Sequence, residues 1–76
     1  MNSLFLPHMT EFKVEGDYIP MIQLLKAAGL VQTGGEAQIV VEHGEVIYNG
    51  EVDYRKRLKV KQGDIVEFRG QKIKAI

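Results

Sequence analysis

The 76-residue chain contains no cysteine. Disulfide bonds, thiolate metal sites and cysteine nucleophiles are therefore excluded, and nothing in the sequence indicates an oxidising compartment. The chain also lacks a run of about eighteen apolar residues, and its N-terminal segment MNSLFLPHM has no basic flank. We therefore expect a cytoplasmic protein that is neither secreted nor inserted in a membrane.

Residue patterns that carry out catalysis are also missing. The only serine, Ser3, has no His/Asp pattern around it, and His43 is a lone histidine rather than a member of a metal-ligand cluster. Glu51 and Asp53 lie two positions apart, but nothing indicates the burial that acid–base catalysis requires. The Walker and dinucleotide-binding glycine patterns are absent. We therefore expect no catalysis, no metal and no cofactor.

Length and composition describe one small globule. Hydrophobic residues make up 45% of the chain and charged residues 26%, without a repetitive tract, which is typical of a folded domain. A chain this short buries only ~60% of the surface that its unfolded form exposes, so there is room for one modest core. We expect residues 1–76 to form a single, monomeric domain.

A first helix is predicted around the segment YIPMIQLLKAAGL. Asp17 is placed to cap its N-terminus, and Pro20 fits the first turn, where a missing N–H costs nothing. The helix is therefore expected to begin near Tyr18. Apolar residues then recur at three- and four-residue steps as far as Ala28, and Gly29 suits the left-handed position that follows the last turn.

A second helix of about three turns is predicted next, because Thr33 and Glu36 form a T-x-x-E capping box and Gly44 provides a stop. A short strand is expected before the first helix, where Phe12 and Val14 alternate with polar residues.

The segment after the second helix is predicted to form strands. An Asn49-Gly50 dipeptide between alternating apolar residues is a strong hairpin signal. Further alternation continues to residue 76, with turns at residues 62–64 and 69–70. The predicted fold class is therefore α+β, with two helices packed on a small antiparallel sheet of four to five short strands.

The formal net charge of zero hides an uneven distribution of charge. Residues 1–54 carry two lysines and eight carboxylates, a net charge of −6, whereas residues 55–76 carry eight cations and two carboxylates, a net charge of +6. Half of the cations fall in one segment of seven residues: Arg55, Lys56, Arg57, Lys59 and Lys61. Such a cluster attracts an anionic backbone such as RNA, through release of counterions.

Spacing within this segment predicts one cationic face. If the chain is extended here, Arg57, Lys59 and Lys61 lie on one side, while Leu58 and Val60 point into the core. The whole patch would then make ~3 to 5 phosphate contacts. A plainer interpretation also stands at this point, because lysine and arginine discourage aggregation at sheet edges, and the acidic half of the chain can neutralise the basic half.

The order of these elements resembles a known family. The pieces are LLKAAGL, then T-x-x-E-A, then GEV-x-x-NGEV, then V-x-x-GD-x-V, and they fall within residues 19–68. Their order and spacing resemble the S-four RNA-binding domain, also called the alpha-L motif, and most of all its small stand-alone bacterial subfamily.

The resemblance implies non-catalytic binding of structured RNA, with ribosomal and transfer RNA as candidate partners. In the family, the start of the second helix and the following hairpin form the RNA-binding face, which maps onto Thr33, Gly34, Gly35, Glu36, Gln38 and Asn49. An open helix N-terminus binds phosphate, and glycines let a backbone approach closely, which agrees with this assignment. Ribosomal-type members carry arginines at the second helix, whereas this chain has its cations in residues 55–61.

Several residues have two interpretations. Lys26 either extends the basic patch from the first helix or has no role. Tyr54, next to the cations, is the best candidate for stacking on an unpaired base, while Tyr18 and Tyr48 are equally well explained as core or rim residues. Asn49 suits the positive φ of a turn without any further role.

A second class of function remains open. The same basic face would suit a small protein-interaction module that docks on an acidic partner.

Overall fold

A computed structural model describes residues 9–76, so Ser3 and the rest of residues 1–8 lie outside the described part. The order of elements is β1 (Met9–Phe12), β2 (Ile19–Pro20), α1 (Met21–Ala27), α2 (Gly34–Glu42), β3 (Val46–Tyr48), β4 (Glu51–Val52), β5 (Lys59–Val60), β6 (Ile65–Phe68) and β7 (Gln71–Ala75). Among the described residues, no helix is long and apolar enough to cross a membrane.

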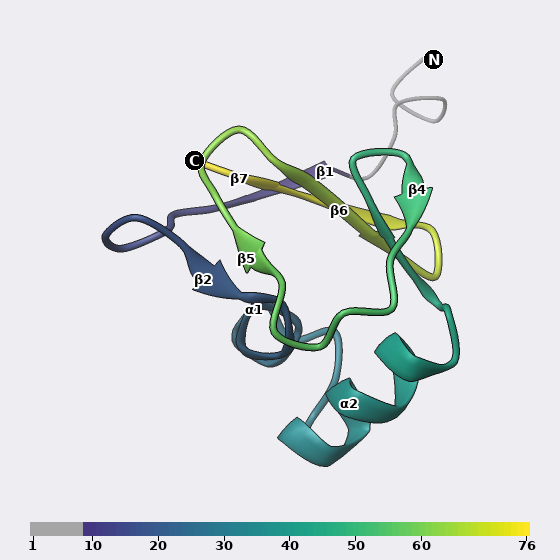
Figure 1. Cartoon of the computed structure of the whole chain (residues 1–76). Coiled ribbons are helices and arrows are strands. Elements are labelled where there is room, and N and C mark those ends of the chain that lie inside the picture. The colour runs from purple at the N-terminus through teal and green to yellow at the C-terminus, as the bar shows by residue number, and fades with distance from the viewer. Residues whose placement is uncertain (1–8) are drawn as a thin grey trace.

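Five strands form one sheet in the order β1-β7-β6-β3-β4, and β2 pairs with β5 in a separate two-stranded sheet. The two helices lie on one side of the larger sheet (Figure 1). The predicted α+β class with two helices on a small sheet is therefore confirmed. The prediction of an antiparallel sheet is wrong for one pair of strands: β1 pairs parallel to β7, while the other pairs of the larger sheet are antiparallel, so this sheet is mixed. Strand alternation along the sequence does not reveal such a pairing between segments far apart.

Helix α1 begins later than the sequence predicted. The prediction that Asp17 caps the helix is wrong. The N-cap residue is Pro20, whose backbone is extended and whose side chain accepts no hydrogen bond from the first helical amides. Ile19 instead pairs with β5, and the amide of Met21 donates to the carbonyl of Leu58 at 2.8 Å. Pairing with a distant strand thus satisfies backbone groups that the local signal had assigned to a helical turn.

The strand expected at Phe12 and Val14 lies earlier in the chain, because β1 ends at Phe12 and leaves Val14 outside it. The cap of α2 and the Asn49-Gly50 turn are confirmed. The Thr33 hydroxyl accepts a hydrogen bond from the amide of Glu36 at 3.1 Å, and the Glu36 carboxylate accepts one from the amide of Gln32 at 3.0 Å. Asn49 and Gly50 have φ values of 49° and 92°, which is the left-handed geometry that the two-residue hairpin between β3 and β4 requires.

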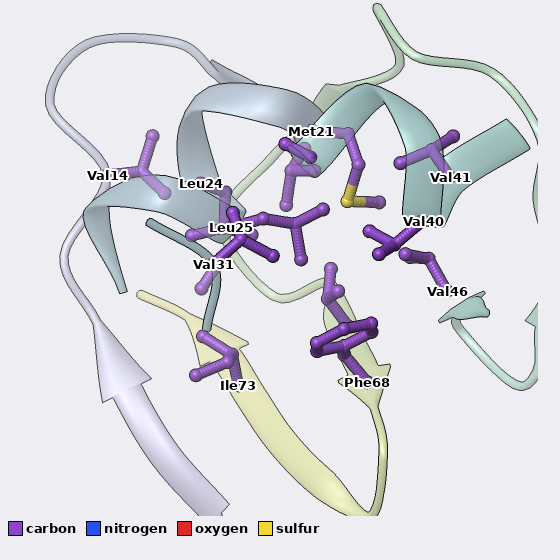
Figure 2. Close-up of a cluster of buried hydrophobic side chains, with 14 residues drawn as sticks. Val14, Met21, Leu24, Leu25, Val31, Val40, Val41, Val46, Phe68 and Ile73 are labelled. Atoms are coloured by element: carbon purple, nitrogen blue, oxygen red, sulfur yellow. The ribbon is translucent and has the colours of Figure 1, made fainter. Parts of the chain in front are cut away.

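The core lies between the helices and the sheet. Figure 2 shows side chains of both helices pointing toward side chains of the strands, including Phe68 and Ile73. Burial alternates along β6 and β7, so one face of each strand packs on the helices. The buried apolar side chains are Val14, Met21, Leu24, Leu25, Val31, Ala37, Val40, Val41, Val46, Val60, Val66, Phe68, Ile73 and Ala75.

Replacing Leu25 by alanine should destabilise the domain by about 2–5 kcal/mol, because the side chain is fully buried and its loss leaves a cavity. The measurement is the free energy of unfolding from urea denaturation followed by circular dichroism. As a control, Ile39→Ala removes an apolar side chain that is 52% exposed on α2 and should change the free energy of unfolding by less than about 0.5 kcal/mol. Equal effects of the two changes would contradict the assigned core.

Candidate nucleic-acid interface

The basic segment, defined as residues 55–61, leaves the larger sheet after β4, passes the helices and ends in β5 (Figure 1). Val60 is completely buried, and Leu58 is partly buried against the core. Arg57, Lys59 and Lys61 are exposed, although only residues 59–60 form a strand and Arg57 lies in a turn rather than in the extended segment that the spacing argument assumed. The packing of two apolar residues therefore orients the cations between and beside them toward solvent.

Two adjoining hollows border the basic segment. The helix groove is lined by Tyr18, Pro20, Ile22, Gln23, Lys26, Gly34, Gln38, Lys56, Arg57 and Lys59. The strand hollow is lined by Tyr48, Arg55, Arg57, Leu58, Lys59 and Lys61. Because Arg57 and Lys59 line both, the two hollows meet at these two residues, and we refer to them together as the concave surface.

All the charged side chains that line this surface are cations. Six of the ten cations of the chain line the two hollows, and no carboxylate lines either of them. A third hollow, beside the β3–β4 hairpin, differs because it contains Glu67 together with Lys72. Clefts lined by charge of one sign concentrate the electrostatic potential and attract ions of the opposite sign.

Two of the six cations are held by the chain's own carboxylates. The Arg55 guanidinium lies 2.7 Å from Asp53 and the Lys56 ammonium 2.8 Å from Glu42. The hydrogen bond from Arg55 lowers the pKa of the Asp53 carboxyl, and the hydrogen bond from Lys56 lowers that of Glu42. Acidic residues of the segment 1–54 thus neutralise the start of the basic segment, as the plainer interpretation anticipated in part.

The remaining cations of the surface are available to a ligand. Within residues 9–76, no carboxylate forms an ion pair with Lys26, Arg57, Lys59 or Lys61. The Lys59 ammonium lies 5.0 Å from the centre of the Tyr18 ring, in a cation–π contact.

Asp64 fixes the rim of the strand hollow. Its carboxylate accepts hydrogen bonds from the Tyr48 hydroxyl at 2.5 Å, the Lys61 amide at 2.8 Å and the Asn49 side chain at 3.2 Å. Burial alone would raise the pKa of the Asp64 carboxyl, but these hydrogen bonds lower it. Burial and the bond to Asp64 raise the pKa of the Tyr48 phenol to about 12. The network ties the β3–β4 hairpin to the end of the basic segment.

Asn49 is a structural residue in this network. Its side-chain oxygen also accepts a hydrogen bond from the amide of Ile65 at 2.8 Å, and it lines neither the helix groove nor the strand hollow. The residue pattern predicted a turn at residues 62–64 but did not indicate the role of Asp64. An acidic residue directly after a turn glycine was the available signal, since such a carboxylate can accept backbone amides.

The start of α2 contributes only some of its predicted residues. Gly34 and Gln38 line the helix groove together with Lys26, whereas the Thr33 hydroxyl and the Glu36 amide bond to each other in the helix cap. Gly35 is exposed but does not line the groove. The groove thus joins the two regions that sequence reasoning had considered separately, the helix start and the basic segment.

Tyr54 lines neither the helix groove nor the strand hollow. Its side chain is 63% exposed, and its ring lies so close to Gly44 that an added Cβ there would be 2.9 Å from a ring carbon. The groove instead contains Tyr18 and Gln23, which the sequence analysis did not place among the site residues. Among residues 9–76, no group of three His, Cys, Asp or Glu side chains could hold a metal ion.

Comparison with known proteins assigns the family. The family model described as "S4 domain" matches residues 12–76. This chain belongs to the S4 domain family. The resemblance inferred from the sequence motifs is therefore confirmed.

Two bacterial relatives of this S4 domain have informative names. A "Putative RNA-binding protein YbcJ" from Escherichia coli (strain K12) is 32% identical over 59 residues, which cover 78% of this chain and 84% of the relative. A "Probable ribosome maturation protein RlbA" from Bacillus subtilis (strain 168) is 37% identical over 57 residues, which cover 75% of this chain and 80% of the relative.

A solved structure shares the fold of this S4 domain. The solution structure of YbcJ from E. coli, whose description mentions an "alfaL motif involved in RNA-binding", matches with a TM-score of 0.68 at 25% sequence identity. The match covers 100% of this chain and 95% of the other.

Replacing Asp64 by asparagine should lower the free energy of unfolding at pH 7 by about 1–3 kcal/mol, because charged hydrogen bonds to Tyr48 and Lys61 are weakened. The pKa of Asp64 is lower in the folded protein than its ordinary value of 3.8. The ionised carboxylate therefore stabilises the folded state fully above pH 3.8, and this stabilisation is lost as the pH falls through the folded-state pKa. The difference between the wild type and Asp64→Asn should therefore shrink below about pH 4.

Urea denaturation over a series of pH values measures this difference. The exposed Asp17, whose side chain makes no hydrogen bond within residues 9–76, provides the matched control Asp17→Asn, which should change stability little at any pH. A difference for Asp64→Asn that stays constant down to pH 2 would contradict the assigned network.

Proposed function

We propose that this S4 domain binds structured RNA without catalysing a reaction. The observation that carries the proposal is the pair of adjoining hollows, lined by six cations and by no carboxylate. Membership of the S4 domain family and the names of the relatives support the same function.

Phosphate groups would be held first by the unpaired cations. Arg57 and Lys59 lie where the two hollows join, so an RNA backbone that runs along the surface passes both of them. Lys61 extends the line on one side, and Lys26 extends it on the other. Each phosphate contact releases condensed counterions, which makes binding favourable at low salt and weaker as salt rises.

The N-terminus of α2 adds a second kind of phosphate contact. Gly34 opens this helix and lines the helix groove, next to the cations of the basic segment. The first amides of a helix have no carbonyl acceptor within the helix, and they carry the positive end of its dipole. A phosphate in the groove would therefore meet the backbone N–H of Gly34 as well as side-chain cations.

Arg55 and Lys56 would exchange partners on binding. The Lys56–Glu42 pair lies at the surface, where solvent screens it, so a phosphate can replace the Glu42 carboxylate without the loss of a buried interaction. Arg55 is itself largely exposed, although the Asp53 side chain beside it is only 14% exposed. We infer from this that the unpaired cations supply most of the affinity and that the paired ones contribute less.

We infer that the domain acts as a monomer in the cytoplasm. Ribosomal RNA is favoured over transfer RNA, because the relative from B. subtilis is named as a probable ribosome maturation protein.

The double change Arg57→Gln and Lys59→Gln should weaken binding to a labelled RNA hairpin by about 10- to 50-fold near 0.1 M salt. Two phosphate contacts would be lost, so the slope of log K against log salt should become shallower by about two. Fluorescence anisotropy over a series of salt concentrations measures both quantities. Circular dichroism checks that the variant remains folded.

Lys13 and Lys74 provide the matched control. Both are exposed and lie outside the two hollows, so Lys13→Gln with Lys74→Gln makes the same change in net charge at another place. This control should bind RNA as the wild type does. Equal weakening by the two pairs of changes would refute a localised RNA surface.

A competition experiment addresses the alternative of an acidic protein partner. Polyglutamate carries a dense negative charge without phosphates or bases. If it displaces the RNA hairpin at equal charge concentration, the surface is a general anion-binding face and the RNA proposal fails.

A further inference from the structure

The helix groove contains more than a path for phosphates. Its wall includes the ring of Tyr18, which is 41% exposed, together with Pro20 and Ile22. An aromatic side chain beside apolar neighbours offers nothing to a phosphate, but it offers a flat, partly dehydrated surface to a nucleobase.

Two side-chain amides also line this groove. Gln23 comes from α1 and Gln38 from α2, and both are exposed. Neither amide forms a hydrogen bond with another group of residues 9–76. A glutamine amide carries two donors and an acceptor, the combination needed to bond the edge of an unpaired base.

We propose that the helix groove takes one unpaired nucleotide of the bound RNA, with its base stacked on Tyr18. This inference rests on the proposed function and specifies what part of an RNA the groove receives. The base edge lies within reach of Gln23 and Gln38, and the flanking phosphates meet Arg57 and Lys59 at the rim. Cations at the rim and an aromatic wall inside match the two chemically different parts of a nucleotide.

In the free domain, Lys59 contacts the face of the Tyr18 ring on which the base would stack. Its ammonium lies 5.0 Å from the centre of the Tyr18 ring in the free domain. Stacking of a base on an aromatic side chain is worth more than an exposed cation–π contact. When a base enters the groove, the flexible Lys59 side chain therefore leaves the Tyr18 ring and binds a phosphate instead. The base can then stack on the ring while Lys59 still contributes to RNA binding.

The other tyrosines do not provide an equivalent site. Tyr48 lines the strand hollow, but its hydroxyl is bonded to Asp64 and its ring packs against the core. Tyr54 lines neither the helix groove nor the strand hollow. Paired RNA would thus lie over the strand hollow by its backbone, while the unpaired nucleotide enters the helix groove.

The test compares two RNA hairpins with the same stem, one fully paired and one with a single-nucleotide bulge. The wild-type domain should bind the bulged hairpin about 5-fold or more tightly. Tyr18→Leu, which keeps an apolar side chain but removes the ring, should abolish this preference and leave the affinity for the paired hairpin nearly unchanged. Tyr18→Phe should preserve it, because stacking requires only the ring.

A fluorescent base reports the contact directly. With 2-aminopurine at the bulge, binding of the wild type should change its fluorescence, and Tyr18→Leu should remove that change. Tyr54→Leu is the matched control and should behave as the wild type in both measurements, because Tyr54 lies outside the groove.

The outcomes separate the two proposals. If the wild type binds both hairpins equally well, or if Tyr18→Leu keeps the preference for the bulge, the inference is overturned while the RNA-binding function stands. If the wild type binds neither hairpin, the proposed function fails and the inference fails with it.

Discussion

The pairing of β2 with β5 is the constraint on which the candidate interface depends. Ile19 faces Val60 across this two-stranded sheet, and Val60 is completely buried. Once this valine is fixed in the core, the neighbouring cations can only point outward. The same pairing holds residues 19–20 extended, which places Tyr18 beside Lys59. One short stretch of backbone hydrogen bonds therefore sets the position of both the charge and the aromatic ring.

Structural features that depend on only a few neighbouring residues were predicted correctly from the sequence. The cap of α2 and the hairpin at Asn49 are decided by side-chain and φ preferences that act within four residues. The start of α1 could not be predicted in this way, because β2 exists only through contact with a strand about forty residues later in the chain. The parallel pairing of β1 with β7 escaped prediction for the same reason.

The candidate site shows a similar division. The charge of the basic segment and the outward direction of Arg57, Lys59 and Lys61 follow from composition and alternation. Sequence alone could not show that Lys56 meets Glu42, since Glu42 is on α2, far from Lys56 along the chain. Nor could the sequence show that Tyr18, rather than Tyr54, lines the groove. Tyr54 is next to the cations in sequence, but Tyr18 is the tyrosine that contacts Lys59 in the folded domain. Family membership supplied the fold but not these contacts.

The parallel pairing of β1 with β7 also bears on how the domain forms. Strand β7 lies between β1 and β6, and its Ala75 exchanges backbone hydrogen bonds with the turn at Gly63 and Asp64. A nascent chain that stops before residue 71 therefore leaves two strands without their shared neighbour and the Asp64 turn without backbone partners. Contacts between segments so distant slow folding. During synthesis, the domain would acquire its RNA-facing shape only after nearly all of it had left the ribosome.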